Sequence, residues 1–531
     1  MKTIKNDLIK YTPRKEQTDV LNFVKENVKN NKFFLLDLPP GVGKSHVSLM
    51  LSDFFISTKK CDKVDMITAG KILQNQYSQT YESINDLKGK ENYDCTEFDC
   101  SCASGKEFSK LNKSECASCP YENSKIAFID GQVSLTNFHL YLIYALYDKV
   151  VLNKRGSKLL IIDECHLIDD VICGFISVKI TENNIKKLTF ANEQEIIKEL
   201  RSVKDIKDYV DFLKYFEQQA GINATTLNRE VESTNTSDAS IKKIQTLVDL
   251  NQVRQKITLF LKEYEDAPNN FVLETNYNEK TKQNELSLEP IWAAKYLEKY
   301  VWSKYDYVVL MSGTILDKKI FSSLNGIPDD KSVYFSIPSP FPVKNRPIYY
   351  LPVGKMTFNE KNNTFQKYRS VLDKILKKYH DKKGIIHTNS FELSTWINEG
   401  IDNERLMFHD SNNRDEMLRT HMETAFPSVF VSPSVSTGVS FDHDKSRFQV
   451  IAKIPYPSLA SQKNKLRQET NPDWYRMVTC QVLIQCCGRS VRSKTDYADT
   501  LILDESFSDI LGRSSHFLPG WFIESIKMIK K

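Results

Sequence analysis

The sequence has 531 residues, of which 40% are hydrophobic and 27% are charged, and its net charge is +5. This length predicts roughly three to four domain-sized units with hydrophobic cores of their own. No apolar run approaches the ~20 residues that cross a bilayer, and the N-terminal residues lack the apolar centre of a signal peptide. We therefore expect a cytoplasmic, intracellular protein with no membrane partner. The net charge is too small to indicate a partner by itself.

The stretch from Asp37 to Ser45 reads Asp-Leu-Pro-Pro-Gly-Val-Gly-Lys-Ser and follows an apolar run. We predict a buried strand at 33–36, a glycine turn, and a helix at 46–56. In such a turn, backbone N–H groups and a helix N-terminus face a triphosphate, the lysine reaches its β and γ phosphates, and the serine ligates magnesium. A plain strand-to-helix turn is the alternative. We predict that ATP and Mg²⁺ bind to Pro40, Gly41, Val42, Gly43, Lys44, Ser45 and His46.

Gln17 lies a short way upstream of this loop, in the stretch Thr-Pro-Arg-Lys-Glu-Gln. Its amide offers a donor and an acceptor, as the edge of adenine requires. An exposed glutamine without a ligand is the alternative, and we predict the adenine contact.

Residues 64–69 predict a second parallel strand, and a helix opens at Lys71. Polar groups at the carboxyl end of a parallel strand face the ligand crevice of an α/β sheet. We expect Thr68 and Gln76 to contact a nucleic-acid backbone there, with helix capping as the alternative.

Two carboxylates end a further apolar strand at 159–162, in the sequence Asp163-Glu164-Cys165-His166. We predict that Asp163 holds the magnesium of Mg·ATP and that Glu164 orients or deprotonates the attacking water. His166 is expected to link this site to its neighbours. The phosphate loop upstream makes a solvated turn a poor alternative.

Five of the eleven cysteines crowd one polar segment with the spacing C-x4-C-x-C-x13-C-x2-C. Thiolates gathered on a loop-rich insert suit a tetrahedral zinc or a 4Fe–4S cluster, and the spacing does not separate the two. We predict a metal site at Cys95, Cys102, Cys116 and Cys119, with Cys100 as the alternative second ligand.

The remaining sequence predicts a helical insert and a second α/β unit. Residues 176–290 carry apolar residues at helical spacing, around 196–216 and 241–264. A strand at 307–311 then ends in Ser312-Gly-Thr314. After a proline-rich stretch, the second unit is expected to have strands at 384–388, 406–409, 429–432, 448–453 and 500–504, parallel and joined by helices.

This second unit lacks a phosphate loop but contains Gln485-Cys-Cys-Gly-Arg489-Ser-Val-Arg492. Arginines three residues apart share one face of a helix. We predict that Arg489 and Arg492 reach the γ-phosphate held by the first unit, as arginine fingers in the same chain, with Gln485 beside them. A surface helix with two arginines is the alternative.

In order, these motifs resemble those of superfamily 2 helicases and, more narrowly, of the XPD/DinG-like iron–sulfur DNA helicases. The resemblance rests on Pro39–Ser45, Thr68–Gln76, the Asp163–His166 box, Ser312–Thr314, Ser432–Asp442 and Gln485–Arg492. The cysteine insert before the Asp-Glu box is its most specific element, and Asn137-Phe-His139 also resembles the family. The fifth motif departs from it, because Thr437-Gly438-Val439-Ser440 stands where the family has Glu-Gly-x-Asp; Gly438, expected at the nucleotide, is kept.

The resemblance implies two RecA-like parallel-sheet domains, at 1–345 and 346–531. The first would be interrupted by an iron–sulfur insert at 82–128 and by an arch-like insert at 176–290. It also implies a 4Fe–4S cluster and a monomeric motor, of minimal or phage type, that uses ATP to move 5′→3′ on single-stranded DNA. Tailed or forked duplex would be its substrate, in repair or replication. An RNA helicase, an ATP-gated DNA clamp that does not unwind, and a structural zinc site stay as alternatives.

Overall fold

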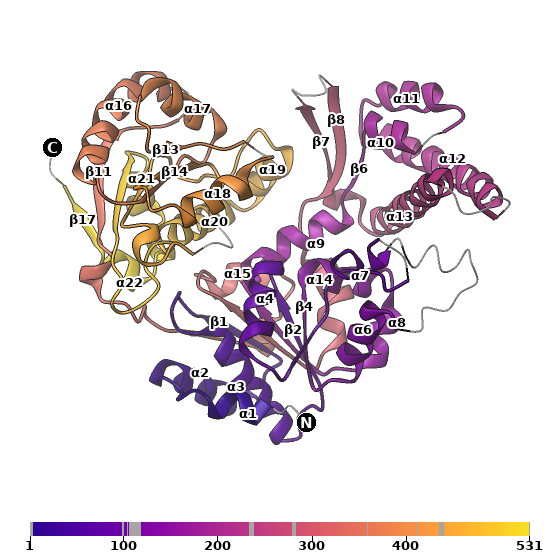
Figure 1. Cartoon of the computed structure of the whole chain (residues 1–531), viewed down its shortest axis with the longest axis horizontal. Helices are drawn as coiled ribbons and strands as arrows, with labels where there is room; N and C mark the ends of the chain where they lie inside the picture. The colour runs from indigo at the N-terminus through magenta and orange to yellow at the C-terminus, as the bar shows by residue number, and fades with distance from the viewer. Residues whose placement is uncertain are drawn as a thin grey trace.

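The computed structural model describes residues 4–97, 100–103, 105, 118–188, 190–232, 238–278, 283–357, 359–410, 412–434 and 440–529. Within this part of the chain, two seven-stranded sheets form two α/β units, and a three-stranded sheet stands beside the first (Figure 1). All strand pairs of the two large sheets are parallel. The predicted fold class, two parallel-sheet α/β domains, is confirmed.

The first sheet has the strand order β10-β1-β9-β5-β2-β4-β3. Its strands are β1 (Phe33–Asp37), β2 (Val64–Thr68), β3 (Ile84–Asp86), β4 (Val133–Asn137), β5 (Leu159–Asp163), β9 (Tyr307–Ser312) and β10 (Ser332–Ser336). Because these strands run parallel, β1, β2, β5 and β9 end at one edge. The phosphate loop, Thr68, the Asp-Glu box and Ser312–Thr314 therefore meet at that edge.

Alternate residues of the first sheet belong to two different hydrophobic clusters. Phe33 and Leu35 of β1 pack into one, and Phe34 and Leu36 pack into the other. Side chains of a strand point to opposite faces in turn, so both faces of this sheet are covered. The covering helices are α1 (Ile4–Ile9), α2 (Lys15–Asn27), α3 (Lys44–Ser57), α4 (Lys71–Thr80), α6 (Pro120–Asp130), α7 (Phe138–Leu146), α8 (Lys149–Arg155), α9 (Ile168–Ile176), α14 (Ala294–Tyr300) and α15 (Lys318–Leu324).

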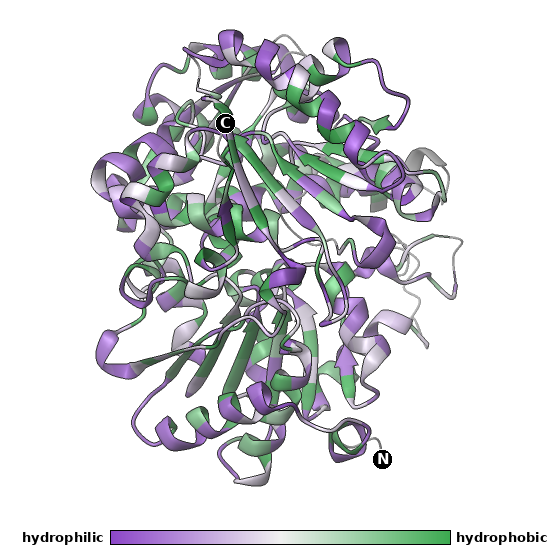
Figure 2. Ribbon diagram, turned by 90° about the vertical axis from the view of Figure 1, so that its left-hand side faces the viewer, coloured by the Kyte–Doolittle hydropathy of each residue, from purple (hydrophilic) through white to green (hydrophobic). Residues whose placement is uncertain are grey.

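The second sheet has the strand order β13-β14-β12-β15-β16-β11-β17. Its strands are β11 (Ile348–Gly354), β12 (Gly384–His387), β13 (Leu406–Met407), β14 (Val429–Ser432), β15 (Phe448–Ile451), β16 (Asp499–Asp504) and β17 (Ile526–Met528). Its helices are α16 (Lys361–Lys378), α17 (Phe391–Gly400), α18 (Arg414–Glu423), α19 (Gln462–Thr470), α20 (Pro472–Cys487), α21 (Phe507–Arg513) and α22 (Gly520–Ile523). Figure 2 shows hydrophobic strands inside the units and hydrophilic outer helix faces.

The insert after α9 contains the expected helices and also an unexpected sheet. Its helices are α10 (Glu182–Lys187), α11 (Glu193–Ser202), α12 (Ile206–Glu232) and α13 (Asp238–Asp266). Strands β6 (Val178–Ile180), β7 (Phe271–Asn278) and β8 (Gln283–Pro290) form an antiparallel sheet at its base. We call this whole segment the arch insert. In Figure 1 its helices project from the first unit, beside the strands β7 and β8.

The base of the arch insert is joined to the second unit through α19. Arg467 of α19 makes a two-pronged ion pair with Asp169 of α9, at 2.8 and 3.1 Å, and its guanidinium carbon lies 5.0 and 5.2 Å from the ring centres of Trp292 and Trp474. Glu274 of β7 accepts hydrogen bonds from two backbone N–H groups and one hydroxyl at the N-terminus of α19. A carboxylate is favourable there because the helix dipole is positive at that end.

Among the described residues, no helix is both long enough and apolar enough to cross a membrane.

Candidate active site

The phosphate loop, residues 39–45, adopts the backbone that its glycines permit. Gly41 and Gly43 have φ angles of +89° and +83°, a left-handed region that favours glycine. A side chain at position 41 would also collide with the ring of Phe341. The loop opens directly into α3, which begins at Lys44 and thus points its N-terminus at the loop. This is a geometry that binds phosphate.

Gln17 braces the phosphate loop through its side-chain amide. Its amide N–H donates to the Val42 carbonyl at 2.8 Å, and its amide oxygen accepts from the Arg14 backbone N–H at 2.9 Å. Gln17 is 5% exposed, so its amide braces the loop. Contact with adenine, which the sequence predicts, remains a prediction.

Lys44 meets both carboxylates of the Asp-Glu box. Its Nζ lies 3.0 Å from Glu164 Oε1 and 3.9 Å from Asp163 Oδ1. Burial raises the pKa of Asp163, whereas the pKa of Glu164 is lowered by Lys44, which overcomes the opposite effect of burial. Glu164 has a φ of +55°, a left-handed conformation that costs a non-glycine residue energy and is found mostly at functional sites. The site therefore keeps Glu164 charged beside a buried cation.

A chain of hydrogen bonds crosses from the second unit into the first. The Gln485 amide donates to His166 Nε2 at 2.6 Å, and His166 Nδ1 donates to the Ser312 hydroxyl at 2.9 Å. Gln485 also donates to the Thr314 hydroxyl, at 3.1 Å. Burial lowers the pKa of His166 to about 4, so the ring is neutral and one nitrogen is free to accept. The structure thus brings together three motifs that the sequence predicts.

Arg489 and Arg492 lie close enough to Glu164 to interact with it electrostatically, but they do not lie on a helix as predicted from the sequence. Helix α20 ends at Cys487 with Gly488 as its C-cap, and both arginines follow in the loop. Burial lowers the pKa of Arg489 to about 10, and Arg492 acts in the same direction. The Nε of Arg492 is buried without a hydrogen-bond partner among the described residues. Two half-buried cations, one of which has a buried donor without a partner among the described residues, favour an anion between the two units.

Three further residues predicted to bind the nucleotide, Pro40, Ser45 and His46, lie among the described residues. A Cβ built on Gly488 would lie 3.7 Å from Pro40, so the loop after α20 adjoins the phosphate loop. The Ser45 hydroxyl lies 3.5 Å from the Tyr81 hydroxyl. His46 is 6% exposed, and its ring meets Tyr11 edge-on. Gly438 lies outside the described residues.

The cysteine segment is described only in part, and Cys116 lies outside the described residues. Cys102 Sγ is 3.7 Å from Cys119 Sγ. The Sγ atoms of Cys95 and Cys100 both lie beside Gly105. No group of three or more metal-ligating side chains close enough to hold an ion is found among the described residues. The metal site therefore remains a prediction.

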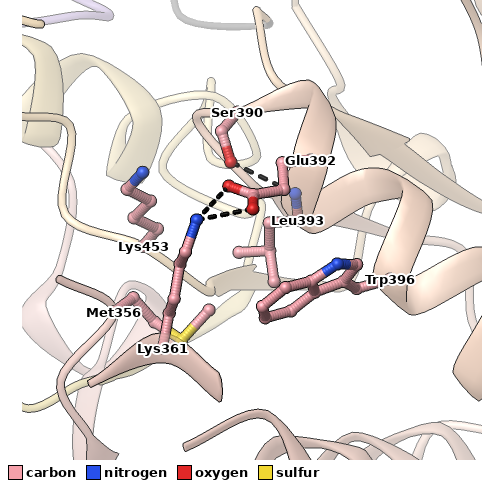
Figure 3. A pocket seen from close by; sticks show the side chains of 7 residues that line it. All are labelled: Met356, Lys361, Ser390, Glu392, Leu393, Trp396 and Lys453. Carbon is pink, nitrogen blue, oxygen red and sulfur yellow. Dashed lines mark hydrogen bonds and ion pairs between the residues drawn. The ribbon is translucent and has the colours of Figure 1, made fainter. Parts of the chain in front are cut away.

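A small pocket with two lysines lies at the carboxyl edge of the second sheet (Figure 3). Lys361 of α16 pairs with Glu392 at 2.7 Å, and Lys453, which follows β15, points into the same pocket. Trp396 of α17 forms its apolar side. The sequence analysis did not identify these residues, because they belong to no motif and come from three separate elements.

Tyr77 and Gln481 contact the predicted motifs, but the sequence gives no signal for the first and only a weak one for the second. The Tyr77 hydroxyl of α4 donates to Asp163 Oδ2 at 2.9 Å. Gln481 donates to the Thr314 carbonyl at 2.8 Å. Gln481 precedes Gln485 by one helical turn, and that spacing alone could have indicated it.

Comparison with known proteins agrees with this architecture. Residues 10–188 match the family "Type III restriction enzyme, res subunit", and residues 364–524 match "Helicase C-terminal domain". The "Probable ATP-dependent helicase" of Methanocaldococcus jannaschii is 19% identical over 94% of this chain and 92% of its own length. The ATP-dependent DNA helicase CHL1 of Vanderwaltozyma polyspora is 20% identical over 74% of this chain. The chain spans 56% of the length of that yeast relative.

Solved structures share the whole fold. An XPD helicase superimposes with a TM-score of 0.62 at 16% identity, covering 98% of this chain and 100% of that one. Xpd4 of S. tokodaii gives 0.59 at 16% identity, with 97% and 100% covered. The two parallel-sheet units are therefore RecA-like motor domains. The family matches and the order of the motifs agree with the resemblance of this chain to the XPD/DinG-like superfamily 2 helicases.

Proposed function

We propose that this chain is an ATP-dependent DNA helicase that moves 5′→3′ along single-stranded DNA and unwinds tailed or forked duplex as a monomer. The observation that carries the proposal is the composite cleft. Lys44, Asp163 and Glu164 stand on one side, and Arg489 and Arg492 stand on the other. A nucleotide that joins two movable units converts its hydrolysis into relative motion of those units.

The residues of the cleft fit ATP and Mg²⁺. Two half-buried arginines and a half-buried lysine offer positive charge to polyanionic phosphates, and Asp163 and Ser45 supply oxygen ligands of the kind magnesium prefers. When bound, magnesium would neutralise charge on the phosphates. Glu164, held as a carboxylate, would orient water and accept its proton. Arg489 and Arg492 would stabilise charge that develops on the transferred phosphoryl group.

Nucleic acid is expected across the carboxyl edges of both sheets. In the first unit Lys71, Gln76 and His139 are exposed at that edge. In the second unit, Lys453 offers positive charge in the pocket that Trp396 lines, whereas Lys361 is paired with Glu392 (Figure 3). Lysine contacts to phosphate and stacking on aromatic rings grip a single strand without reading its sequence. We propose DNA rather than RNA as the substrate because the CHL1 relative is named a DNA helicase.

We propose that the cysteine segment holds a 4Fe–4S cluster, as the family resemblance implies. Soft sulfur donors from Cys95, Cys102 and Cys119 fit such a cluster, which would brace the segment. Zinc is a second candidate, because the 3.7 Å between Cys102 and Cys119 matches the sulfur–sulfur edge of about 3.8 Å in a tetrahedral site with Zn–S of about 2.3 Å. Metal analysis with absorption near ~400 nm separates the two.

The test of the proposed function combines hydrolysis and unwinding. Lys44→Ala is expected to abolish ATP hydrolysis stimulated by single-stranded DNA. Lys29→Ala, an exposed lysine of the same unit, is the matched control and should hydrolyse ATP normally. Ordinary turnover by Lys44→Ala would falsify the assignment. Strand displacement on 5′-tailed but not 3′-tailed duplex is expected. No displacement would favour an ATP-gated clamp, and stimulation by RNA alone would favour an RNA helicase.

A further inference from the structure

Both proposed magnesium ligands are touched by tyrosines of one helical segment. The Tyr77 hydroxyl of α4 donates to Asp163 Oδ2 at 2.9 Å, and the hydroxyl of Tyr81, directly after α4, lies 3.5 Å from the Ser45 hydroxyl. The two residues are four apart, and their rings contact each other edge to face. One rigid segment therefore holds a side chain against each ligand.

The Asp163 carboxylate is fixed from two directions. Its Oδ1 accepts the backbone N–H of Glu164 at 2.9 Å, and its Oδ2 accepts Tyr77. Tyr77 is 2% exposed, and its hydroxyl also lies 3.4 Å from that of Ser48 on α3. A phenol ring has few rotatable bonds, so a shift of α4 moves the hydrogen bond to Asp163 directly. The orientation of this carboxylate thus depends on the position of α4.

The other face of α4 lies at the edge where nucleic acid is expected. Lys71 and Gln76 are exposed on it. Between them the buried Gln74 donates to the Leu87 carbonyl and accepts from Asn137, which caps α7 just before the exposed His139. The hydrogen bonds of Gln74 fix α4 to its neighbours. A ligand that contacts Lys71 or Gln76 therefore acts on α4 as a whole.

We propose that Tyr77 is a positioning residue that couples contact between nucleic acid and α4 to the orientation of Asp163. Nucleic acid that displaces α4 changes the placement of the carboxylate through this one hydrogen bond, and ATP hydrolysis thereby depends on the strand. The inference rests on the proposed function, since it needs Asp163 to be a magnesium ligand.

Tyr77→Phe removes the hydroxyl and keeps the ring. We expect the ratio of strand-stimulated to strand-free kcat to fall at least fivefold. Binding of a fluorescent ATP analogue should weaken several-fold in Mg²⁺ but not in EDTA, because only the magnesium-dependent part uses Asp163. Tyr81→Phe serves as a second, milder variant and should weaken magnesium-dependent binding in the same direction.

Tyr305→Phe is the matched control. It removes another buried tyrosine-to-aspartate hydrogen bond of the same unit, Tyr305 to Asp65 at 2.6 Å. It is expected to leave both the stimulation ratio and the magnesium dependence unchanged. Wild-type values in Tyr77→Phe, or an equal loss in Tyr305→Phe, would overturn the inference. A wild-type protein that hydrolyses ATP without any response to nucleic acid would instead overturn the proposed function, and magnesium-dependent binding would still test the contact of Tyr77.

Discussion

Replacing Arg467 with methionine removes the charge that joins α19 to α9 but keeps an apolar side chain beside Trp292 and Trp474. The Arg467 side chain is 1% exposed and that of Asp169 is 14% exposed, so a nearly buried carboxylate loses its cation. Breaking such a pair costs about 3–5 kcal/mol. Burial raises the pKa of Asp169, so protonation relieves part of that cost. We expect Arg467→Met to lower the free energy of unfolding by about 3 kcal/mol.

Tryptophan fluorescence during urea unfolding measures this loss, because two of the five tryptophans of the chain lie beside Arg467. The transition should move to lower urea in Arg467→Met. The exposed Arg476, paired with Asp473, supplies the control, and its replacement by methionine should cost about 0.5 kcal/mol or less.

The double variant Arg467→Met, Asp169→Asn leaves no unpaired charge. Its loss of unfolding free energy should be smaller, by at least about 1.5 kcal/mol, than the sum of the losses in the two single variants. Losses that add within about 0.5 kcal/mol would refute the view that the ion pair joins these elements.

Three further predictions concern hydrolysis and pH. Glu164→Gln should lower kcat about 10²–10⁴-fold with little change in nucleotide affinity, because only proton acceptance is lost; steady-state kinetics with equilibrium binding measures both, and an unchanged kcat would contradict the role. Arg492→Ala should lower kcat by about 10³-fold or more, measured in the same assay with the exposed Arg419→Ala as control; equal rates would exclude it as a finger. His421 is buried, with Nε2 donating to the Lys445 carbonyl and Nδ1 accepting from Ser428, and burial lowers its pKa to about 4. This pKa lies below the unfolded value of about 6.5, so the contribution of neutral His421 to the free energy of unfolding is complete above pH 6.5. It is lost as the pH falls towards 4, by about 3 kcal/mol. Urea unfolding at several pH values measures this loss, and a dependence of stability on pH that His421→Gln does not reduce would count against it.

The two α/β units were predictable because their strands are continuous apolar runs. The strands β1, β5 and β14 are buried along their whole length, so each of these apolar runs matches one strand. The strands β7 and β8 were not predicted, because they interrupt a segment whose helical periodicity dominates on either side. Their residues, such as those of β7 at 271–278, are half polar and pair with each other.

The site was predictable where a motif carries its chemistry, and not where the fold alone makes a contact. Lys44, Asp163 and Gln485 each belong to a local pattern with a known physical role. Tyr77 has no such pattern, since its importance comes only from the hydrogen bond that its hydroxyl makes to Asp163 at the end of β5. The loop conformation of Arg489 was missed because the spacing of two arginines fits a helix equally well; Gly488, which ends α20, was the available sign.

The capping of α19 by Glu274 has a mechanical consequence. Together with Arg467 it fixes α19 to the arch base at two points, so this corner of the molecule is a natural fulcrum for rotation of the second unit. Residues near a fulcrum move little, whereas residues far from it sweep a longer arc. Arg489 and Arg492 are separated from α19 by the 16 residues of α20, and the loop that carries them adjoins the phosphate loop. A small angular change about α19 is therefore amplified into a larger displacement of the two arginines.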